Sequence, residues 1–353
     1  MNTIFTNLLL KWDKNQNHRP MPWKGEKDPY KIWLSEIILQ QTRVEQGWNY
    51  YEKFIRQYPT IFKLAAANED QVFKMWEGLG YYNRCRNLLF TAKYIVNELK
   101  GIFPSNYNDL LTLKGVGPYT AAAIASFAYN LPHAVVDGNV FRVFARYYGI
   151  HTPTDTKEGV LIFNKIALEN LSKNKAGIYN QALMDFGATI CKPMSPLCAN
   201  CVMQNTCVAF ANNKVGQLPI KIKEIQKKKR YFDYFVFQLN EKVLIQKREV
   251  GDIWAGLFQF YLVENDKQIV ANEDYFKQIL TNQLMIDLNT VHIDKEFQVY
   301  QQQLTHQLLT LRFIKITLKT MPKVFEKGDW IKFNKLNKYA FPKTINSFLE
   351  SYQ

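Results

Sequence analysis

The sequence predicts a multi-domain protein with an all-α region over residues 1–211 and an α+β region over residues 230–353. Apolar residues recur at helical spacing in successive segments up to about residue 210. Residues 212–229 are polar and basic and include a glycine and a proline, which is typical of an inter-domain linker. From Tyr231 onward, runs of aromatic and β-branched residues favour strands. A chain of 353 residues is long enough for the two cores that this division requires.

The composition favours a polyanionic partner. The formal net charge is +14 and the isoelectric point is near 9.3, which favours a nucleic acid over a neutral small molecule. The sequence contains no signal-peptide pattern and no apolar stretch of bilayer length. We therefore expect a cytoplasmic protein that does not enter a membrane.

The all-α region is predicted to begin with a helix over residues 1–16, followed by a loop that contains three prolines. Asp28 followed by Pro29 indicates a helix start, because aspartate caps helices and proline is tolerated at the first helical position. The helix that begins there is expected to run through residues 30–47 and contains Glu36. Further helices are expected over residues 48–57, 61–67, 69–76, 84–99, 107–111, 119–128, 140–148, 158–171 and 179–190.

The segment LKGVGPY, residues 113–119, predicts a tight turn that leads into a helix. Gly115 and Gly117 supply conformational freedom without a Cβ atom, and Pro118 takes the first helical position. Backbone N–H groups at such a helix start, with Lys114 beside them, can bind a phosphate. The alternative interpretation is an ordinary turn between two helices.

A carboxylate follows this hairpin at the start of the next predicted helix. The apolar run Ala134-Val135-Val136 ends at Asp137, which can cap that helix, act in catalysis, or do both. A phosphate-binding hairpin followed by such a carboxylate resembles the helix–hairpin–helix DNA glycosylases of the endonuclease III superfamily.

Four of the five cysteines lie close together, at Cys191, Cys198, Cys201 and Cys207. Their spacing, C-x6-C-x2-C-x5-C, suits a tetrahedral zinc ion or a [4Fe–4S] cluster, and the spacing alone does not choose between them. The fifth, Cys85, is expected to be a packing residue.

The α+β region is predicted to contain strands over residues 231–239, 242–248 and 308–318 and helices over residues 273–282 and 343–352. The segment GDIWAGLFQF resembles part of the Nudix fold, but the acidic REx2EE metal-binding core of Nudix hydrolases is absent, so pyrophosphatase activity is not expected. The basic run Lys227-Lys228-Lys229-Arg230 is expected to be solvated rather than bound to phosphate.

Taken together, PWK, DPYKIWLSEIILQQTRV, GLGYYNRCRN, LKGVGPYTAAAI, VVDGNVFR and the cysteine loop resemble the MutY family of adenine DNA glycosylases. These motifs extend from about residue 20 to residue 207, and the Nudix-like region completes the resemblance. It implies a helix–hairpin–helix glycosylase fold, with a six-helix core over about residues 23–130 and a cluster subdomain of residues 1–22 and 131–211. It also implies that the cysteines hold a [4Fe–4S] cluster.

The resemblance assigns catalytic roles to several residues. Releasing adenine requires an acid that protonates the base and an anion that stabilises the oxocarbenium ion. By resemblance, Glu36 is the acid at adenine N7, Asp137 is the stabilising anion, and Asn139 positions the acid and the attacking water. From the residues alone, Glu36 could equally be a solvated surface glutamate. Tyr119 stands where bifunctional relatives carry a Schiff-base lysine, so a monofunctional enzyme is expected.

The resemblance also implies that the target base is flipped out of the duplex. Gln41 and Tyr81 correspond to the family's wedge residues, with Thr42 beside the opposite base, whereas Trp23 and Gln181 correspond to the lining of the adenine pocket. The residues alone would suit a surface amide, a core aromatic residue and a helix-end hydroxyl at the first three positions.

At two places the chain departs from the family pattern. Lys24 stands where many relatives carry arginine, which keeps the charge but removes bidentate donors. Leu304-Thr305-His306 takes the place of the Phe-Ser-His turn that recognises 8-oxoguanine, so the hydroxyl and the ring donor remain and the aromatic stacking surface is lost. The alternative for this segment is a hairpin turn that only starts the next strand.

The expected function is monofunctional removal of adenine opposite 8-oxoguanine or guanine in double-stranded DNA, in base excision repair. The protein is expected to act as a monomer and to associate with the nucleoid when bound to DNA. The alternatives are a mismatch thymine glycosylase of the same superfamily and a non-catalytic, cluster-bearing DNA-binding protein.

Overall fold

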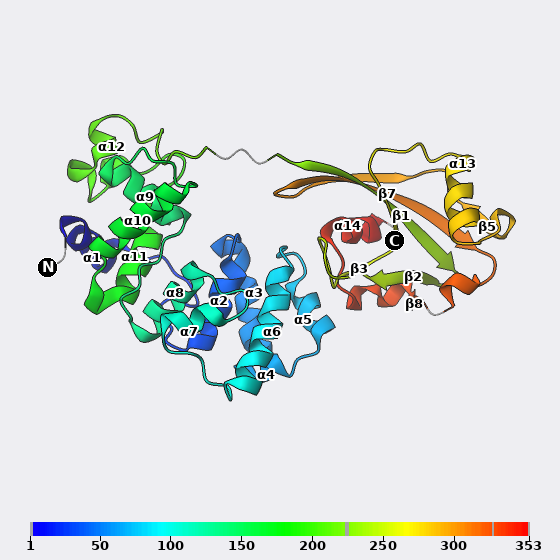
Figure 1. Ribbon diagram of the computed structural model, residues 1–353, viewed down its shortest axis with the longest axis horizontal. Coiled ribbons are helices and arrows are strands. Elements are labelled where there is room, and N and C mark those ends of the chain that lie inside the picture. The colour runs from blue at the N-terminus through cyan, green and yellow to red at the C-terminus, as the bar shows by residue number, and fades with distance from the viewer. Residues whose placement is uncertain (1–2, 223–225, 327, 352–353) are drawn as a thin grey trace. The chain divides into compact units, whose positions relative to one another are not determined.

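The computed structural model describes residues 3–222, 226–326 and 328–351 of the chain. It contains two compact units, one formed by residues 1–67 and 86–223 and the other by residues 68–85 and 224–353. The first is helical, and the second combines a sheet with helices (Figure 1). Among the described residues, no helix combines the length and the apolar character needed to cross a membrane.

The helices of the first unit follow the predicted order, but the helix expected through residue 47 was wrong in extent, because α2 ends at Leu39 and α3 begins at Val44. Asp28 caps α2 by accepting a hydrogen bond from the Tyr30 N–H, and Asp137 caps α9 by accepting one from the Val140 N–H. The prolines predicted at first helical positions begin α2 and α8. The α-helices are α1 (Ile4–Gln16), α2 (Pro29–Leu39), α3 (Val44–Gln57), α4 (Ile61–Ala65), α6 (Asn83–Glu98), α7 (Tyr107–Thr112), α8 (Pro118–Tyr129), α9 (Gly138–Tyr148), α10 (Lys157–Asn170), α11 (Ala176–Thr189) and α12 (Val208–Ala211). Single 3-10 turns lie at η1 (Lys173–Lys175), η2 (Cys198–Asn200) and η3 (Gln204–Thr206).

One core of the helical unit joins the N-terminus to helices far along the chain. Phe5, Leu9 and Trp12 on α1 are buried against α9 and α11, where Trp12 meets Phe186 edge-on at 5.0 Å. The same core includes Leu218, which is 2% exposed. The N-terminal helix is therefore packed into the part of the chain that carries the cysteines.

The predicted linker over residues 212–229 is partly packed against the helical unit. The Thr154 N–H donates to the Ile220 carbonyl at 3.0 Å, and Arg146 Nε donates to the Leu218 carbonyl at 3.0 Å. The Ile222 N–H contacts the Asp155 carboxylate at 3.2 Å. Residues 223–225 of the predicted linker lie outside the described residues, and strand β1 begins at Lys228.

The second unit is built on a sheet with the path β3-β2-β1-β7-β5, in which β4 also pairs with β1, β6 with β7, and β8 with β2. Strands β1 and β7 are long and parallel, with Lys228 opposite Gln307, and all other pairings are antiparallel. The strands are β1 (Lys228–Leu239), β2 (Lys242–Lys247), β3 (Phe258–Gln259), β4 (Tyr261–Asn265), β5 (Val291–Ile293), β6 (Gln298–Gln303), β7 (Gln307–Leu318) and β8 (Asp329–Lys332). The three predicted strands correspond to β1, β2 and β7, while the short strands were not predicted.

Helices cover both faces of this sheet (Figure 1). Successive side chains of β1 point to opposite faces of the sheet. Phe232 and Tyr234 pack on the face that is covered by the C-terminal helix α14 (Lys343–Ser351). Phe235 and Phe237 pack on the face that is covered by α13 (Glu273–Phe276). The helix predicted over residues 273–282 is confirmed, although only its first turn is α-helical and the rest is a π-helix. The elements are α13 (Glu273–Phe276), the π-helix η4 (Lys277–Gln283), α14 (Lys343–Ser351) and the 3-10 segments η5 (Leu288–Thr290), η6 (Lys323–Phe325) and η7 (Phe333–Lys338). Residue 352, the predicted end of the last helix, lies outside the described residues.

The second unit also includes residues 68–85, which carry α5 (Glu69–Trp76). Three polar contacts join this segment to the C-terminal chain: Lys247 pairs with Asp70 at 2.6 Å, the Phe341 N–H donates to Glu77 at 2.9 Å, and Lys74 donates to the Tyr339 carbonyl at 3.0 Å. These contacts explain why a segment from the middle of the helical sequence clusters with the sheet.

The expectation that the whole run from Lys227 to Arg230 is solvated was wrong for its last residue. The three lysines are exposed, whereas Arg230 is 8% exposed. Arg230 lies in β1, where alternation turns it into the sheet and toward two carboxylates, Asp252 and Glu264. Charge matching within the fold therefore replaces hydration for this residue.

Candidate active site

Glu36 lines the same cavity of the helical unit as two other catalytic candidates, Tyr119 and Asp137. It projects from α2 and is 4% exposed, which excludes the solvated-glutamate interpretation. Burial raises the pKa of its carboxyl to about 7, the nearby Asp137 charge also raises it, and a hydrogen bond from Tyr119 opposes the rise. A carboxyl with this pKa remains partly protonated at neutral pH and can donate a proton.

An open cavity of about 550 Å³ brings Glu36 together with Tyr119 and Asp137. Leu39, Gln40, Gln41, Val136, Gly138 and Phe141 complete its lining. The Tyr119 hydroxyl also contacts Met184 Sδ at 3.7 Å, and burial beside two carboxylates raises its pKa well above the usual value. Tyr119 is therefore a neutral hydrogen-bond donor rather than a phenolate at physiological pH.

Asp137 uses both carboxylate oxygens within its own helix start. Oδ1 accepts from the Val140 N–H at 2.8 Å, and Oδ2 accepts from Asn139 Nδ2 at 2.7 Å. Burial raises the Asp137 pKa, while these two hydrogen bonds and the charge of Arg142 oppose the rise by favouring the anion. Asp137 therefore forms the predicted helix cap and also lines the cavity, whereas its catalytic role stays a prediction.

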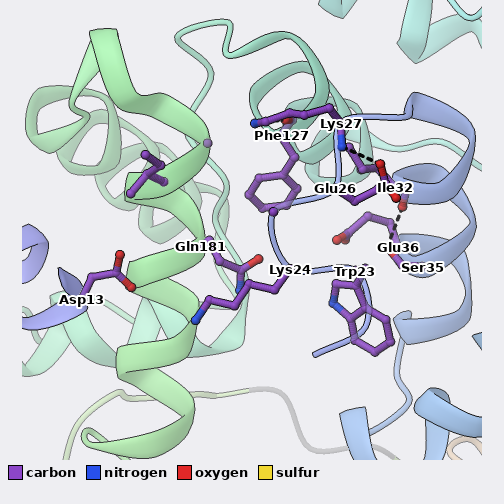
Figure 2. A pocket seen from close by; sticks show the side chains of 13 residues that line it. Asp13, Trp23, Lys24, Glu26, Lys27, Ile32, Ser35, Glu36, Phe127 and Gln181 are labelled. Carbon is purple, nitrogen blue, oxygen red and sulfur yellow. Dashed lines mark hydrogen bonds between the residues drawn. The ribbon is translucent and has the colours of Figure 1, made fainter. Parts of the chain in front are cut away.

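Glu36 also lines a second, smaller cavity of about 160 Å³ that lies between the loop after α1, α2, α8 and α11. Figure 2 shows the two predicted pocket residues, Trp23 and Gln181, with Lys24 and Glu36 around this space. Trp23 is 8% exposed and is held edge-on to Tyr51 at 5.3 Å. The smaller cavity is therefore a pocket with an aromatic wall, an amide, a cation and an acid.

Asp185 accepts hydrogen bonds from two residues that line this pocket, Lys24 and Gln181, and the sequence analysis did not identify it. It is fully buried, and its two oxygens accept from four side chains. These donors are Arg19 NH1 at 3.0 Å, Gln181 Nε2 at 3.1 Å, Lys24 Nζ at 3.0 Å and Asn17 Nδ2 at 3.0 Å. The Asp185 carboxylate therefore holds the side chains of Lys24 and Gln181 in place. In the sequence, the one indication of this role is the i, i+4 spacing of Gln181 and Asp185 on α11.

Arg142 is a second residue that the sequence analysis missed. It is 8% exposed, and its NH2 donates to Asn139 Oδ1 at 2.8 Å while its Nε donates to the Cys191 carbonyl at 2.7 Å. Asn139 is in turn bound to Asp137. A chain of hydrogen bonds therefore runs from Asp137 through Asn139 and Arg142 to the cysteine loop. In the sequence, the role of Arg142 is indicated by its i, i+3 spacing from Asn139.

The hairpin between α7 and α8 has the predicted turn, but its two glycines differ. Gly115 has a φ of +83°, and a Cβ atom there would lie 2.9 Å from Asn87 Cβ, so glycine is required by the fold itself. Gly117 has a φ of −92° and open space around it, so the expectation that its backbone freedom is needed was wrong. The Lys114 ammonium lies 4.5 Å from the Phe90 ring centroid, beside the start of α8.

The three candidates for contact with the duplex lie in loops. Gln41 follows α2, is exposed and has a φ of 56°, and the neighbouring Thr42 hydroxyl contacts the Gln40 carbonyl at 3.5 Å. Tyr81 belongs to the second unit, is 47% exposed and has a φ of 49°. A left-handed conformation is uncommon for residues with side chains, and such strain concentrates at functional positions.

In the second unit, Leu304, Thr305 and His306 form the tight turn between β6 and β7. The turn is closed by the Leu304 N–H, which donates to the Gln307 carbonyl at 2.8 Å. Thr305 and His306 are exposed, whereas Leu304 is half-buried against the core under α14. The Thr305 hydroxyl lies 2.5 Å from the Tyr81 hydroxyl, so two predicted DNA-contacting residues meet within this unit.

The four cysteines of the C-x6-C-x2-C-x5-C loop line one small cavity of about 30 Å³. Arg146 NH1 lies 3.5 Å from Cys191 Sγ, and burial raises the Cys201 pKa to about 11. Thiols bind iron and zinc as thiolates, so the residue types of this loop, though not the present spacing of their side chains, suit either metal. Within the described ranges, no three Cys, His, Asp or Glu side chains converge closely enough to hold a single metal ion.

Comparison with known proteins identifies both halves of the chain. Residues 34–164 match the HhH-GPD superfamily of base excision DNA repair proteins, and residues 234–351 match the NUDIX domain family. The adenine DNA glycosylase of Buchnera aphidicola subsp. Baizongia pistaciae is 32% identical over 98% of this chain and 96% of its own length. The human adenine DNA glycosylase is 39% identical over 61% of this chain and 41% of its own length.

Among solved structures, a thermostable thymine-DNA glycosylase is similar to the helical part. It has a TM-score of 0.55 and 30% identity, and the match covers 59% of this chain and 96% of the other. It therefore matches little more than half of this chain, whereas the similarity to the Buchnera protein extends through both the HhH-GPD and the NUDIX parts. On that evidence the chain belongs to the adenine DNA glycosylase family.

Proposed function

We propose that this adenine DNA glycosylase removes adenine opposite 8-oxoguanine or guanine by acid-assisted hydrolysis without cutting the strand. Removal of adenine in base excision repair follows from its family. The observation that best supports the mechanism is the place of Glu36, which lines both the small pocket and the open cavity. An acid at this junction can reach a base in the pocket and the sugar outside it.

In this mechanism the flipped adenine enters the pocket lined by Trp23 and Gln181. Glu36 donates its proton to N7 of the base, so that adenine leaves as a neutral molecule and the C1′–N9 bond breaks. Positive charge then develops on the sugar, and Asp137 stabilises it from the open cavity. Asn139 holds Asp137 in place and helps to direct the attacking water, which bonds to C1′ and returns a proton to the Glu36 carboxylate.

Tyr119 supports the monofunctional course of this reaction. A phenol has no amine with which to form a Schiff base at C1′, so β-elimination has no catalyst at this position. Instead, the hydroxyl donates to Glu36 and stabilises its anion after proton transfer. Strand cleavage is therefore left to a later step of repair.

Binding to DNA is assigned to surfaces on both units. We propose that the start of α8, with Lys114, Gly115 and Gly117, holds a backbone phosphate, because free N–H groups and a cation lie there. Gln41 and Tyr81 fill the space that the flipped base leaves, with Thr42 close to the opposite base. The net charge of +14 favours association with the nucleoid.

We propose that the cysteine loop holds a [4Fe–4S] cluster, as in the endonuclease III superfamily. When bound, the cluster would fix the loop between α11 and α12, with Cys191, Cys198, Cys201 and Cys207 as ligands. With it we propose a cluster subdomain of residues 1–22 and 131–211 and a six-helix core within about residues 23–130, where residues 68–85 cluster with the second unit.

The turn at Leu304, Thr305 and His306 is proposed as the reader of 8-oxoguanine. Its hydroxyl and imidazole are exposed at the tip of a hairpin and can form hydrogen bonds to the lesion. Leu304 is turned partly into the core, so it offers little stacking surface to a base. The preference for the lesion would then depend on Thr305 and His306.

The test is a single-turnover glycosylase assay on duplexes that contain A·8-oxoG, A·G and T·G. Product is expected from the first two only, and Glu36→Gln is expected to lower the rate by at least about 100-fold while DNA binding remains. Near-native rates for Glu36→Gln would refute its role as the acid. The structural similarity to a thymine-DNA glycosylase makes the T·G duplex the decisive arm for the second candidate function.

A further inference from the structure

The Arg230 side chain in β1 forms five hydrogen bonds. A guanidinium has five N–H donors, and here all five are used. Nε and NH2 bind the two oxygens of Glu264 at 2.7 and 2.6 Å, and NH1 and NH2 bind those of Asp252 at 2.8 and 2.6 Å. The remaining NH1 donor binds the Gln307 Oε1 atom at 3.1 Å.

The three partners come from different parts of the unit. Asp252 lies in the loop after β2, Glu264 lies in β4, and Gln307 is the first residue of β7. Asp252 also binds Arg248, so two arginines and two carboxylates balance each other in one cluster. Because its donors are saturated inside the fold, Arg230 is not placed to bind a DNA phosphate.

Gln307 connects this cluster to the turn that carries Thr305 and His306. Its backbone carbonyl accepts from the Leu304 N–H and closes the turn, while its side chain accepts from Arg230. The Lys228 N–H donates to the His306 carbonyl at 2.9 Å, two residues before Arg230 on the same strand. The β7 end of the turn is therefore fixed twice by β1, through the backbone of Lys228 and the side chain of Arg230.

We propose that Arg230 is a positioning residue for recognition of the base opposite adenine, acting through Gln307 on the Leu304–His306 turn. The proposal depends on the proposed role of that turn as the lesion reader. Two hydrogen-bond donors at the tip of an exposed hairpin give specificity only if the hairpin is held in one position. The ion-pair cluster supplies that rigidity, because the Arg230 and Arg248 side chains are 9% exposed and are held by two carboxylates, Asp252 and Glu264, that are 37% and 39% exposed.

The experiment measures single-turnover rates of the full-length protein on A·8-oxoG and A·G, and takes their ratio. Arg230→Lys keeps the charge but offers only three donors, so it cannot bind both carboxylates and Gln307 as arginine does. We expect the ratio to fall by at least about fivefold, comparable with the loss of one base contact. The A·G rate is expected to stay within about twofold, because that duplex presents no 8-oxo group.

Arg312→Lys is the matched control. Arg312 lies farther along β7 and makes a similar bidentate pair with the buried Asp233, at 2.8 and 2.7 Å. Arg312→Lys tests the general effect of weakening an arginine–carboxylate pair in this sheet, and we expect the ratio to be unchanged. An equal fall in both variants would overturn a specific role for Arg230.

Variants of Gln307 test the link itself and serve if Arg230→Lys does not fold. Gln307→Leu removes the acceptor and is expected to lower the ratio as Arg230→Lys does, whereas Gln307→Glu retains an acceptor and is expected to preserve it. A native ratio in Gln307→Leu would overturn the proposal. His306→Ala separates the role of the turn as lesion reader from the role of Arg230 as positioning residue. If His306→Ala leaves the ratio unchanged, the turn is not the lesion reader. If His306→Ala lowers the ratio and the Arg230 and Gln307 variants do not, only the positioning role of Arg230 fails.

Discussion

Replacing Glu36 by glutamine should stabilise the protein at high pH and leave its stability unchanged at low pH. The folded protein holds a proton on Glu36 up to a pKa of about 7, whereas the unfolded chain releases it near 4.5. Between these values the folded state binds more protons, so the free energy of unfolding falls as the pH rises. Above pH 7 the whole free-energy cost of burying a charged carboxylate is subtracted from the free energy of unfolding, and below pH 4.5 none of it is.

The pKa values set the size of the effect. Each pKa unit corresponds to about 1.4 kcal/mol, so a pKa of about 7 in place of 4.5 corresponds to about 3 kcal/mol. No discount for solvent screening applies, because Glu36 is 4% exposed. For a unit of this size, about 3 kcal/mol corresponds to a rise in the melting temperature of roughly 6–12 °C in Glu36→Gln at pH 8.

The measurement is thermal unfolding, followed by circular dichroism at 222 nm, of native protein and Glu36→Gln at pH 5 and pH 8. Glu98→Gln, at an exposed position near the end of α6, is the control and is expected to give the same small difference at both values. If Glu36→Gln raises the melting temperature equally at pH 5 and pH 8, the carboxyl is not buried with a raised pKa. The reasoning about its role as an acid would then lose its basis.

Three further predictions concern the hairpin, the tyrosine and the cysteine loop. Gly115→Ala should lower the free energy of unfolding by more than about 1 kcal/mol, because residue 115 has a φ of +83° and an added Cβ atom would meet Asn87. Gly117→Ala should change the free energy of unfolding by less than about 0.5 kcal/mol. Equal losses for the two variants in urea titrations would contradict this. The native protein should leave the DNA strand intact until alkali treatment, and borohydride should trap no covalent enzyme–DNA adduct. The Tyr119→Lys variant supplies an amine, so an adduct is expected only there. A stoichiometric adduct with native protein would refute the monofunctional mechanism. Cys198→Ser should lower iron content and soluble yield, and metal analysis that finds one zinc and no iron in the native protein would exclude the cluster.

The sequence was sufficient for features whose causes are local. Asp28 and Asp137 were expected as helix caps, and both caps form because the side chain and the N–H that it accepts from are two or three residues apart. Gly115 was expected in a turn, and its positive φ bears that out. Long helices and the strands β1 and β7 were likewise evident from their periodicity.

Features that depend on distant residues were not predictable in this way. Asp185 resembles a surface carboxylate on α11 until Arg19 and Lys24, more than 160 positions away, are brought to it. Arg230 looks like the end of a solvated basic run, and only the folded sheet supplies Asp252 and Glu264 as its partners. Burial of a charge is a property of the tertiary structure, so one sequence without its fold does not reveal it.

The packing of residues 212–222 bears on how the helical half can be produced by itself. A recombinant fragment that stops at residue 211, where the predicted linker begins, would lack Leu218, whose burial is worth about 1.5–3 kcal/mol. Arg146 would also lose the carbonyl that it binds in the buried interior. A fragment that ends at residue 222 retains both contacts, so in limited proteolysis the peptide bonds beside Leu218 and Ile220 should resist cleavage while the chain remains folded.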